Sequence, residues 1–280
     1  MVVLPVTTNL LARYRASDLV AADGARVLTL VDISGNGRDL TATLGAVYRE
    51  HSQIDDRPTL EFSKTEGEGY VSGSAWFPTT ASAYVVAVTN ATDSSLVTGE
   101  SDGVNSNSGW FLYDRRGDWR MYSNGSALTT IPSFRTPVVL SAATGGGTGR
   151  LVYGNTGVRP PDIGDVIQIG SGALNDISSP RRAFIGDSDV SGRVLDGDIY
   201  EVLIYGEHHS VSQQDEITGW LMTEYGLPGI TKWVNVGLGV MSSEPVAVDG
   251  VLVSGASDPG GTSYERPTTG RVYPAPNVYN

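Results

Sequence analysis

Residues 197–228, GDIYEVLIYGEHHSVSQQDEITGWLMTEYGLP, contain both kinds of element that the sequence predicts. The first nine, Gly197–Tyr205, are rich in branched and aromatic residues, which predicts a strand. Ser210 and Gln213 then form a capping-box pattern, and Gly226 with a proline two residues later marks a helix end. Between these signals apolar residues recur at spacings of three and four, which predicts a single amphipathic helix. They are Ile217, Trp220, Leu221 and Tyr225.

The rest of the chain consists of short strand-like segments broken by Gly, Asn, Asp and Ser. Tyr84–Thr89 is apolar on both faces, which indicates a central strand, and Leu10–Ala16 alternates as a half-buried strand does. Many short antiparallel strands with regular turns predict an all-β sandwich or jelly roll. The other expected strands are Trp110–Asp114, Asp118–Ser123, Pro137–Ala143, Arg150–Tyr153, Val166–Gly170 and Arg182–Ile185.

Composition excludes several classes of protein. The 280 residues hold 19 Lys and Arg against 31 Asp and Glu, a net charge of −12, so we expect no nucleic-acid partner. The 35 glycines and 14 prolines exclude a helical bundle. Because cysteine is absent, disulfides and thiolate chemistry are excluded. Apolar stretches such as Ala83–Val88 are too short to span a bilayer, so we expect no membrane insertion.

The composition of the sequence changes near residue 230. Residues 1–230 carry the strand and helix signals, whereas residues 231–280 end in a Gly, Pro, Thr and Tyr-rich stretch. A segment with so few apolar residues near its end cannot bury a core by itself. We therefore expect 231–280 to be a β or irregular extension that serves as a docking or assembly arm.

Two patterns raise the question of catalysis. Gly99–Gly103 matches a nucleophile elbow, but a Ser and Asn-rich loop follows Ser101 where that motif requires a helix. Asp196, Asp198 and Glu201 cluster in one strand, yet strict alternation would point Asp198 and Glu201 to opposite faces. Glu201 is expected to be partly buried and hydrogen bonded. Since acid/base chemistry needs two convergent groups, the sequence predicts that the chain is not an enzyme.

Aromatic side chains are the feature that a carbohydrate-binding protein would use. Flat rings pack on the apolar faces of sugars, while carboxylates and amides bind the hydroxyl groups. Alternation places two sets of rings on opposite faces of one hairpin, so one set must belong to the core. The candidates are Trp76 in a loop, Trp110, Tyr113, Trp119 and Tyr122 around the hairpin, and the carboxylate of Asp114.

Oxygen-rich loops are candidates for binding Ca²⁺. A hard cation requires several converging oxygen ligands, and Asp and Asn supply them, although both are also ordinary turn residues. None of these loops has the complete EF-hand spacing. The candidate ligands are Asp102, Asn105 and Asn107 in one loop and Asp187 and Asp189 in another.

The order of these segments resembles the concanavalin A-like lectin/glucanase superfamily in its laminin-G-like branch. The similar segments bracket residues 9–228 and end with the helix that runs to Leu227. The resemblance implies a two-sheet antiparallel jelly-roll sandwich that binds glycans or proteins. The segments that carry it are Leu11–Leu19, Asp32–Asp39 (DISGNGRD), Arg57–Phe62 and Gly197–Tyr205.

The N-terminus has no basic start and no long apolar run, so no conventional signal peptide is expected. A module of this kind without an export signal fits a virion protein that lysis releases, and the chain resembles lectin-like tail or decoration proteins of tailed bacteriophages. We expect a minor tail or receptor-binding protein that contacts a host-surface glycan, and other virion proteins through 231–280, as a homo-oligomer. A capsid decoration protein, a bacterial surface lectin module and a glycoside hydrolase stay open as alternatives.

Overall fold

The computed structural model divides the chain into two compact units, Met1–Gly229 and Ile230–Asn280. In the second unit β17 (Val246–Val248) pairs with β18 (Val251–Val253), and β19 (Ser263–Glu265) pairs with β20 (Val272–Pro274). The described residues are 4–52, 54, 56–90, 94–100, 109–115, 118–132, 137–155, 166–188 and 193–227, together with these four strands.

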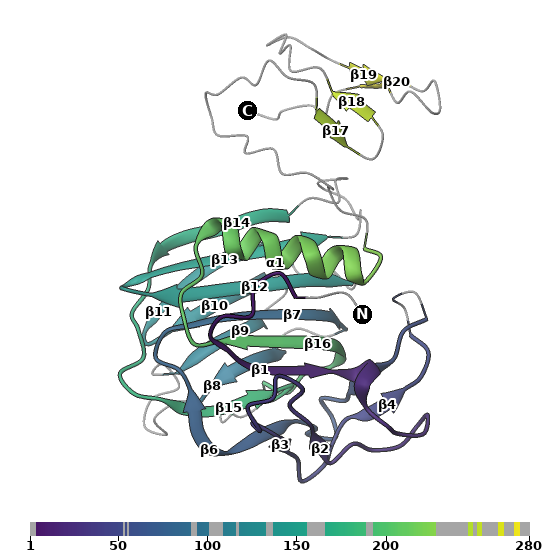
Figure 1. Ribbon diagram of the computed structural model, residues 1–280, viewed down its shortest axis with the longest axis vertical. Helices are drawn as coiled ribbons and strands as arrows, with labels where there is room; N and C mark the ends of the chain where they lie inside the picture. Colours follow the sequence, from purple (N-terminus) through teal and green to yellow (C-terminus); the bar gives the residue numbers. More distant parts are fainter. Residues whose placement is uncertain are drawn as a thin grey trace. The chain divides into compact units, whose positions relative to one another are not determined.

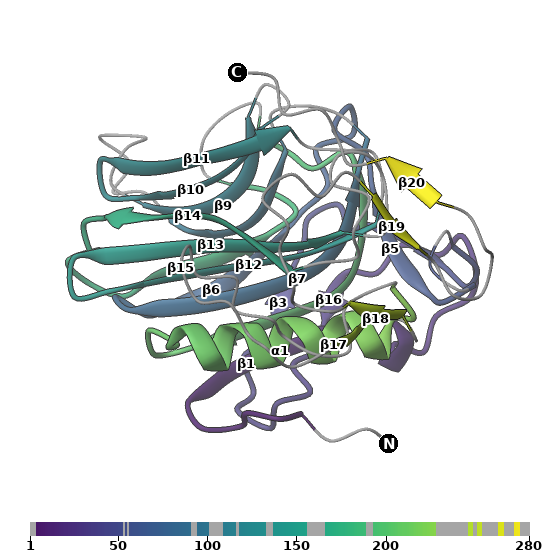
Figure 2. The same ribbon diagram turned by 90° about the horizontal axis from the view of Figure 1, so that it is seen from above.

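The first unit is built from two antiparallel sheets (Figures 1 and 2). Sheet A has eight strands, and β1 (Leu10–Arg15) joins it by pairing with β16. The other strands are, in spatial order, β14 (Val166–Ala173), β13 (Thr148–Asn155), β12 (Val138–Gly145), β7 (Ala81–Thr89), β16 (Gly197–Tyr205), β5 (Thr59–Phe62) and β4 (Val47–Arg49).

Sheet B also has eight strands, and with sheet A it confirms the predicted all-β class. One α-helix, α1 (Val211–Glu224), and a short 3₁₀ helix, η1 (Ala16–Asp18), complete the described part of this unit. In spatial order the strands are β11 (Ser126–Pro132), β10 (Asp118–Ser123), β9 (Trp110–Arg115), β8 (Ser95–Gly99), β15 (Arg181–Ile185), β6 (Tyr70–Phe77), β3 (Leu40–Thr41) and β2 (Thr29–Leu30).

Strand β7 explains why one segment of the sequence is apolar on both faces. Ala83, Val85 and Ala87 belong to the apolar core between the sheets. Tyr84 and Val86, which alternate with them, belong to a second cluster that includes residues of α1. Every residue of β7 is buried. The strand is central, as predicted, because sheet B covers one of its faces and other apolar residues cover the second.

Helix α1 begins and ends as its sequence predicts. The Ser210 hydroxyl accepts the Gln213 backbone N–H while the Gln213 side chain accepts the Ser210 N–H, which completes the capping box. At the other end Gly226 adopts a φ of 61°, a left-handed conformation that glycine adopts with little cost. The N–H of Leu227 then donates to the Met222 carbonyl. Both ends of the helix therefore have their backbone groups satisfied.

A buried carboxylate connects α1 to sheet A. Glu201, which is 1% exposed, accepts the Arg13 Nε–H of β1 at 2.7 Å and the Tyr225 hydroxyl at 2.8 Å. Burial raises the pKa of Glu201, and the neighbouring Arg13 opposes that rise. The prediction of a buried, hydrogen-bonded Glu201 is confirmed. One side chain of β16 thus holds both β1 and the end of α1.

The DISGNGRD segment is a turn whose polar groups are satisfied within the chain. The Asp32 carboxylate accepts N–H groups from Arg13 at 3.0 Å, Ser34 at 2.8 Å and Arg38 at 3.0 Å, and the Ser34 hydroxyl at 2.9 Å. Burial acts to raise the pKa of Asp32, but these hydrogen bonds outweigh it and the net shift is downward. The segment is accounted for by turn chemistry alone.

Tyr225→Phe tests the Glu201 connection. Removing the hydroxyl leaves a buried carboxylate oxygen without its donor, so we expect the free energy of unfolding to fall by about 1–3 kcal/mol. Urea unfolding at neutral pH measures this. Tyr48→Phe is the matched control, because Tyr48 is also buried but lies outside this connection, and a change below about 0.5 kcal/mol is expected. Equal losses in the two variants would contradict the assignment.

Candidate functional site

The outward faces of the two sheets differ in what covers them. Helix α1 packs on β12, β13 and β14 of sheet A (Figure 1). In the part of the chain that the structure describes, no α-helix packs on sheet B. Side chains alternate along each strand, so sheet B directs one set into the core and the other outward. The outward side of sheet B thus carries no described helix; Phe111 and Tyr113 on it are nevertheless buried, whereas Arg120 and Tyr122 of β10 are partly exposed.

Three aromatic rings lie together on this face, over β9 and β10. Tyr122 pairs with Phe111 across the two strands, and the ring centroids are 6.0 Å apart. Phe111 and Tyr113 are 6.2 Å apart. Phe111 and Tyr113 are buried, whereas Tyr122 is partly exposed. Burial raises the pKa of the Tyr122 hydroxyl, which keeps it protonated and able to donate a hydrogen bond.

A guanidinium group lies over this aromatic cluster. The Arg193 Cζ atom is 5.3 Å from the Phe111 ring centroid and 5.2 Å from that of Tyr113. Both distances are within the range of cation–π attraction. The Arg193 carbonyl accepts the Ser95 N–H at 3.2 Å, which ties this segment to the start of β8. We call Phe111, Tyr113, Tyr122 and Arg193 the arginine–aromatic cluster.

A second arginine lies over a ring on β15. Arg182 and Phe184 alternate with core residues of that strand, and the Arg182 Cζ atom is 5.6 Å from the ring. The Arg182 Nε–H donates to Glu100 at 2.8 Å. This hydrogen bond lowers the pKa of Glu100, so the pair carries no net charge near neutrality. Rings and guanidinium groups thus occur together on two neighbouring parts of sheet B.

Only part of the predicted carbohydrate set reaches this face. Tyr113 and Tyr122 belong to the arginine–aromatic cluster, but Tyr113 is 2% exposed, so Tyr122 is the predicted ring that is partly exposed there. Trp110 and Trp119 were the wrong choice, because both are 0% exposed on the core side of sheet B. Asp114 is 1% exposed on that same side, so its carboxylate cannot contact a sugar at the surface. The alternation of side chains along the hairpin strands predicted that one set of rings belongs to the core, but it did not indicate which set.

Trp76 lies on a strand instead of the predicted loop. It is the seventh residue of β6, half-buried, and packs against the core between the sheets. The Arg38 Cζ atom is 4.9 Å from its ring centroid. One face of the ring is therefore occupied by protein, and Trp76 does not belong to the arginine–aromatic cluster.

The calcium candidates fall mostly outside the described residues. Of these ligands only Asp187 is described, and its carboxylate accepts the Ser188 N–H at 2.6 Å while its carbonyl accepts the Thr98 hydroxyl. Among the described residues no group of three or more His, Asp or Glu side chains is arranged to hold a metal ion. The calcium candidates Asp102, Asn105, Asn107 and Asp189 lie outside the described residues. Ser101 of the nucleophile-elbow pattern lies outside them too.

A β-bulge in β16 changes which carboxylates share a face. Ile199 pairs with Ala87 and Glu201 pairs with Val86, so Tyr200 is an extra residue in β16. Asp198 and Glu201 consequently lie on the same face of sheet A, and the prediction of opposite faces was wrong. Strict alternation fails here because a bulge shifts the phase by one residue.

This face brings two carboxylates into a direct cross-strand pair. Asp198 lies opposite Glu61 of β5, and such partners have Cβ atoms about 5 Å apart. The Arg49 Nε–H donates to Glu61 at 2.5 Å. Burial first, and then the charge of Glu61, raise the pKa of Asp198 to about 6. The Asp198 carboxyl group is therefore protonated up to about pH 6, and it lies beside Glu61, which is paired with Arg49. General acid catalysis requires a carboxyl group that is still protonated at the working pH.

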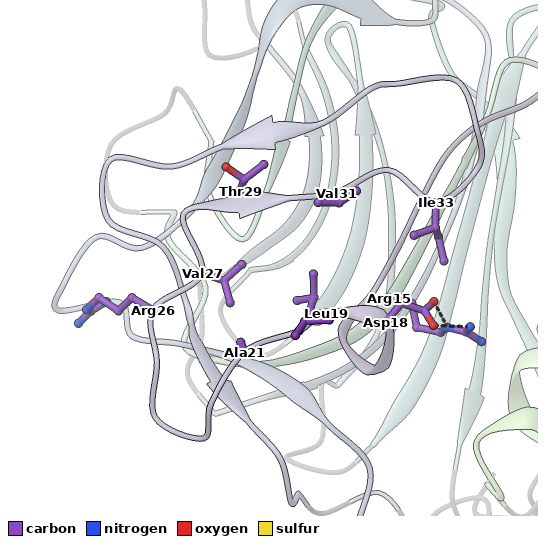
Figure 3. Close-up of a pocket in the computed structure, with 10 residues that line it drawn as sticks. Arg15, Asp18, Leu19, Ala21, Arg26, Val27, Thr29, Val31 and Ile33 are labelled. Atoms are coloured by element: carbon purple, nitrogen blue, oxygen red, sulfur yellow. Dashed lines mark hydrogen bonds and ion pairs between the residues drawn. The ribbon is translucent and has the colours of Figure 1, made fainter.

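A cavity of about 410 Å³ lies between η1 and the segment that contains β2 (Figure 3). Its walls include Leu19, Val31 and Ile33, and Arg15 on its rim is paired with Asp18 at 2.6 Å. None of the residues that line it is aromatic. An aliphatic cavity whose rim charges are already paired offers little to a sugar.

No described helix has the length and apolar character needed to cross a membrane.

Comparisons with known proteins identify the fold but no family. No family model matches the sequence, and neither does any curated protein. Domain 4 of AbnA, a GH43 extracellular arabinanase from Geobacillus stearothermophilus in complex with arabinotriose, is 15% identical with a TM-score of 0.51. The match covers 75% of this chain and 98% of that domain.

Two larger enzymes contain a similar fold. A GH54 α-L-arabinofuranosidase soaked with a cyclic sulfate inhibitor is 11% identical with a TM-score of 0.56, covering 80% of this chain and 66% of that one. Trypanosoma rangeli sialidase in complex with the inhibitor DANA is 14% identical with a TM-score of 0.53, and the match covers 78% of this chain and 34% of the sialidase. The chain therefore spans about a third of the sialidase and two thirds of the arabinofuranosidase. At these identities the fold is what is shared.

These structures correct two expectations. The assignment to the concanavalin A-like lectin/glucanase superfamily is overturned, because the neighbours are an arabinanase domain, an arabinofuranosidase and a sialidase, and no family model supports it. Its most specific motif, the DISGNGRD turn, satisfies its own hydrogen bonds and so identifies no family. The expectation that the chain is not an enzyme is overturned too, because carbohydrate-active enzymes contain this fold.

Asp198→Asn tests the electrostatics of the carboxylate pair. Because the folded state raises the pKa of Asp198, its contribution to stability is present at low pH and is lost as pH rises through about 6. We expect the variant to be more stable than wild type by roughly 1–3 kcal/mol at about pH 8, and equal to it at about pH 4. Urea unfolding at both pH values measures this. Glu66→Gln, at an exposed carboxylate, is the control, and a pH-independent difference would contradict the shift.

Proposed function

We propose that this chain is a carbohydrate-binding protein and that its ligand lies on the helix-free face of sheet B. The observation that carries the proposal is the arginine–aromatic cluster, in which Arg193 lies over Phe111 and Tyr113 beside the partly exposed Tyr122. The partly exposed ring of Tyr122 can pack against the apolar face of a sugar, while the Arg193 guanidinium and a phenol hydroxyl bind its oxygens. Phe111 and Tyr113 are buried and support Arg193 from below. Tyr122 stands on a sheet strand, which lowers the cost of binding.

The neighbours in structure support a carbohydrate ligand. All three proteins named above act on or bind sugars by their names, and the arabinanase domain was solved with arabinotriose. That domain is matched over nearly its whole length, so a chain of this size and fold is sufficient to hold an oligosaccharide there. We propose that the present chain also holds an oligosaccharide. We further propose that residues 1–230 have the jelly-roll connectivity that the sequence predicts.

We further propose a virion setting for this activity. The acidic, cysteine-free composition fits a protein of a tailed bacteriophage that attaches to host-surface glycans, as a minor tail or receptor-binding component. In this proposal the protein is extracellular after lysis, forms a homo-oligomer and contacts other virion proteins through residues 231–280. A capsid decoration protein and a bacterial surface lectin module are the alternative settings for the same binding face.

Glycoside hydrolysis is a second candidate function, favoured by the Asp198–Glu61 pair. Retaining glycosidases place two carboxyl groups about 5 Å apart, one acting as acid and the other as nucleophile. Asp198, with a pKa of about 6, fits the acid, and Glu61, about half exposed beside Arg49, fits the nucleophile. This candidate uses a different sheet from the binding face, so the two functions are separable by mutation.

Tyr122→Ala tests the binding face. Loss of the partly exposed ring removes a stacking surface without opening the core, so we expect the Kd for a glycan identified on a glycan array to rise about 5–30-fold. Isothermal titration calorimetry measures the change. Val20→Ser, which alters an exposed residue of the aliphatic cavity, is the control and should leave the Kd within twofold. The reverse pattern would move the binding site to the cavity.

Turnover of a panel of 4-nitrophenyl glycosides tests the second candidate. If the pair acts as proposed, wild type releases nitrophenol, and activity declines as pH rises above about 6 because Asp198 loses its proton. Asp198→Asn and Glu61→Gln should each reduce kcat by at least about 100-fold, while Tyr122→Ala, on the other sheet, should leave kcat and KM unchanged. No release by wild type at any pH, or release that both carboxyl variants retain, would remove this candidate.

A further inference from the structure

The charge of Arg193 is not balanced by any residue that the structure describes. Among the described residues, Arg193 makes no ion pair and no side-chain hydrogen bond, and its recorded contacts are the two rings beneath it and a backbone bond. Six other described arginines have a carboxylate partner, whereas Arg38, like Arg193, lies over an aromatic ring without one in the described part of the chain. The six pairs are Arg13–Glu201, Arg15–Asp18, Arg26–Glu66, Arg49–Glu61, Arg57–Glu224 and Arg182–Glu100.

An unpaired arginine is unexpected in this composition. Acidic residues exceed basic ones by 12, so carboxylates are abundant, and most of the arginines named above lie against one. Arg193 is half-buried, which makes an unbalanced charge more costly than it would be in open water. Its position between β8 and β16 is nevertheless well defined, because its carbonyl accepts the Ser95 N–H. The charge therefore calls for an external partner.

The rings beneath Arg193 orient its guanidinium for such a partner. Phe111 and Tyr113 attract the charge of the group, whose Cζ atom lies 5.3 and 5.2 Å from their ring centroids. Among the described residues, the side-chain N–H groups of Arg193 have no hydrogen-bond acceptor. An arginine edge presents two parallel N–H groups, which match the two oxygens of a carboxylate or a phosphate. The cluster thus presents a preoriented site for an oxyanion.

Two described carboxylates on or next to the neighbouring strands do not balance Arg193. Glu100, which directly follows β8, is paired with Arg182 of β15. On β9, Asp114 is buried and alternates with Tyr113, which places it on the core side of the sheet.

We infer that the glycan bound by this face is anionic, and that Arg193 binds its carboxylate or phosphate group while Tyr122 contacts the sugar. The inference deepens the proposed carbohydrate-binding function and rests on it. An acidic sugar residue and a phosphodiester-linked glycan supply the same oxyanion geometry, so the chemistry that they share is what the site recognises. Attraction between unlike charges also predicts that affinity decreases as ionic strength rises.

Calorimetric titration of the full chain with three defined polymers tests this inference. The probes are oligogalacturonate for the carboxylate, poly(glycerol phosphate) for the phosphate and neutral arabino-oligosaccharide. We expect wild type to bind one of the two anionic polymers, and Arg193→Gln to weaken that binding about 10–100-fold. Arg193→Lys keeps the charge but not the paired N–H groups, so an intermediate loss is expected. Thermal unfolding of each variant monitors folding.

Arg15→Gln, which removes an arginine from β1 of sheet A, is the charge-matched control and should change the affinity less than twofold. Binding of arabino-oligosaccharide alone would overturn the anionic inference and leave the proposed function intact. Binding of none of the polymers, together with no binding on a glycan array, would overturn the proposed function itself. Anionic binding that folded Arg193→Gln retains in full would also overturn the role of Arg193.

Discussion

The buried carboxylate of Glu201 determines which face of this protein is free. It accepts hydrogen bonds from Arg13 of β1 and from Tyr225 at the end of α1, and burial makes the loss of either donor costly. These bonds, together with the apolar cluster beneath the helix, hold α1 on sheet A. Since that helix packs on sheet A, the partly exposed Tyr122 and Arg193 lie on the side of the fold that no described helix covers.

The two sheets therefore carry different chemistry. On sheet B, the rings of β9 and β10 alternate with a mostly apolar core side, and Arg193 lies over two of them. On sheet A, Asp198 and Glu61 are direct cross-strand partners, and the bulge at Tyr200 places Glu201 on the same face as Asp198. Binding and acid–base chemistry would thus use separate surfaces, which is why variants on one sheet serve as controls for the other.

Local patterns in the sequence predicted the elements well, and long-range pairing set the limits of prediction. Capping and spacing identified α1, and two-sided apolarity identified β7, because both signals arise within a few residues. The bulge at Tyr200 leaves no signal in composition or spacing. The choice between Trp110 and Tyr113 depends on which sheet face meets the core, and Arg193 becomes a candidate only when β9 is placed beside it. His209, which directly precedes the helix cap Ser210, is buried, and its Nδ1 lies 2.7 Å from the Tyr84 hydroxyl, a contact that no local pattern indicates.

Hydrogen–deuterium exchange in the presence of saturating oligosaccharide tests the central claim, that the ligand occupies the helix-free face of sheet B. The account predicts slower exchange in peptides that cover β9, β10 and the segment around Arg193, with unchanged exchange in α1 and in β4 and β5. Protection confined to β4, β5 and the start of β16 would instead place the ligand on the carboxylate pair of sheet A and contradict the account.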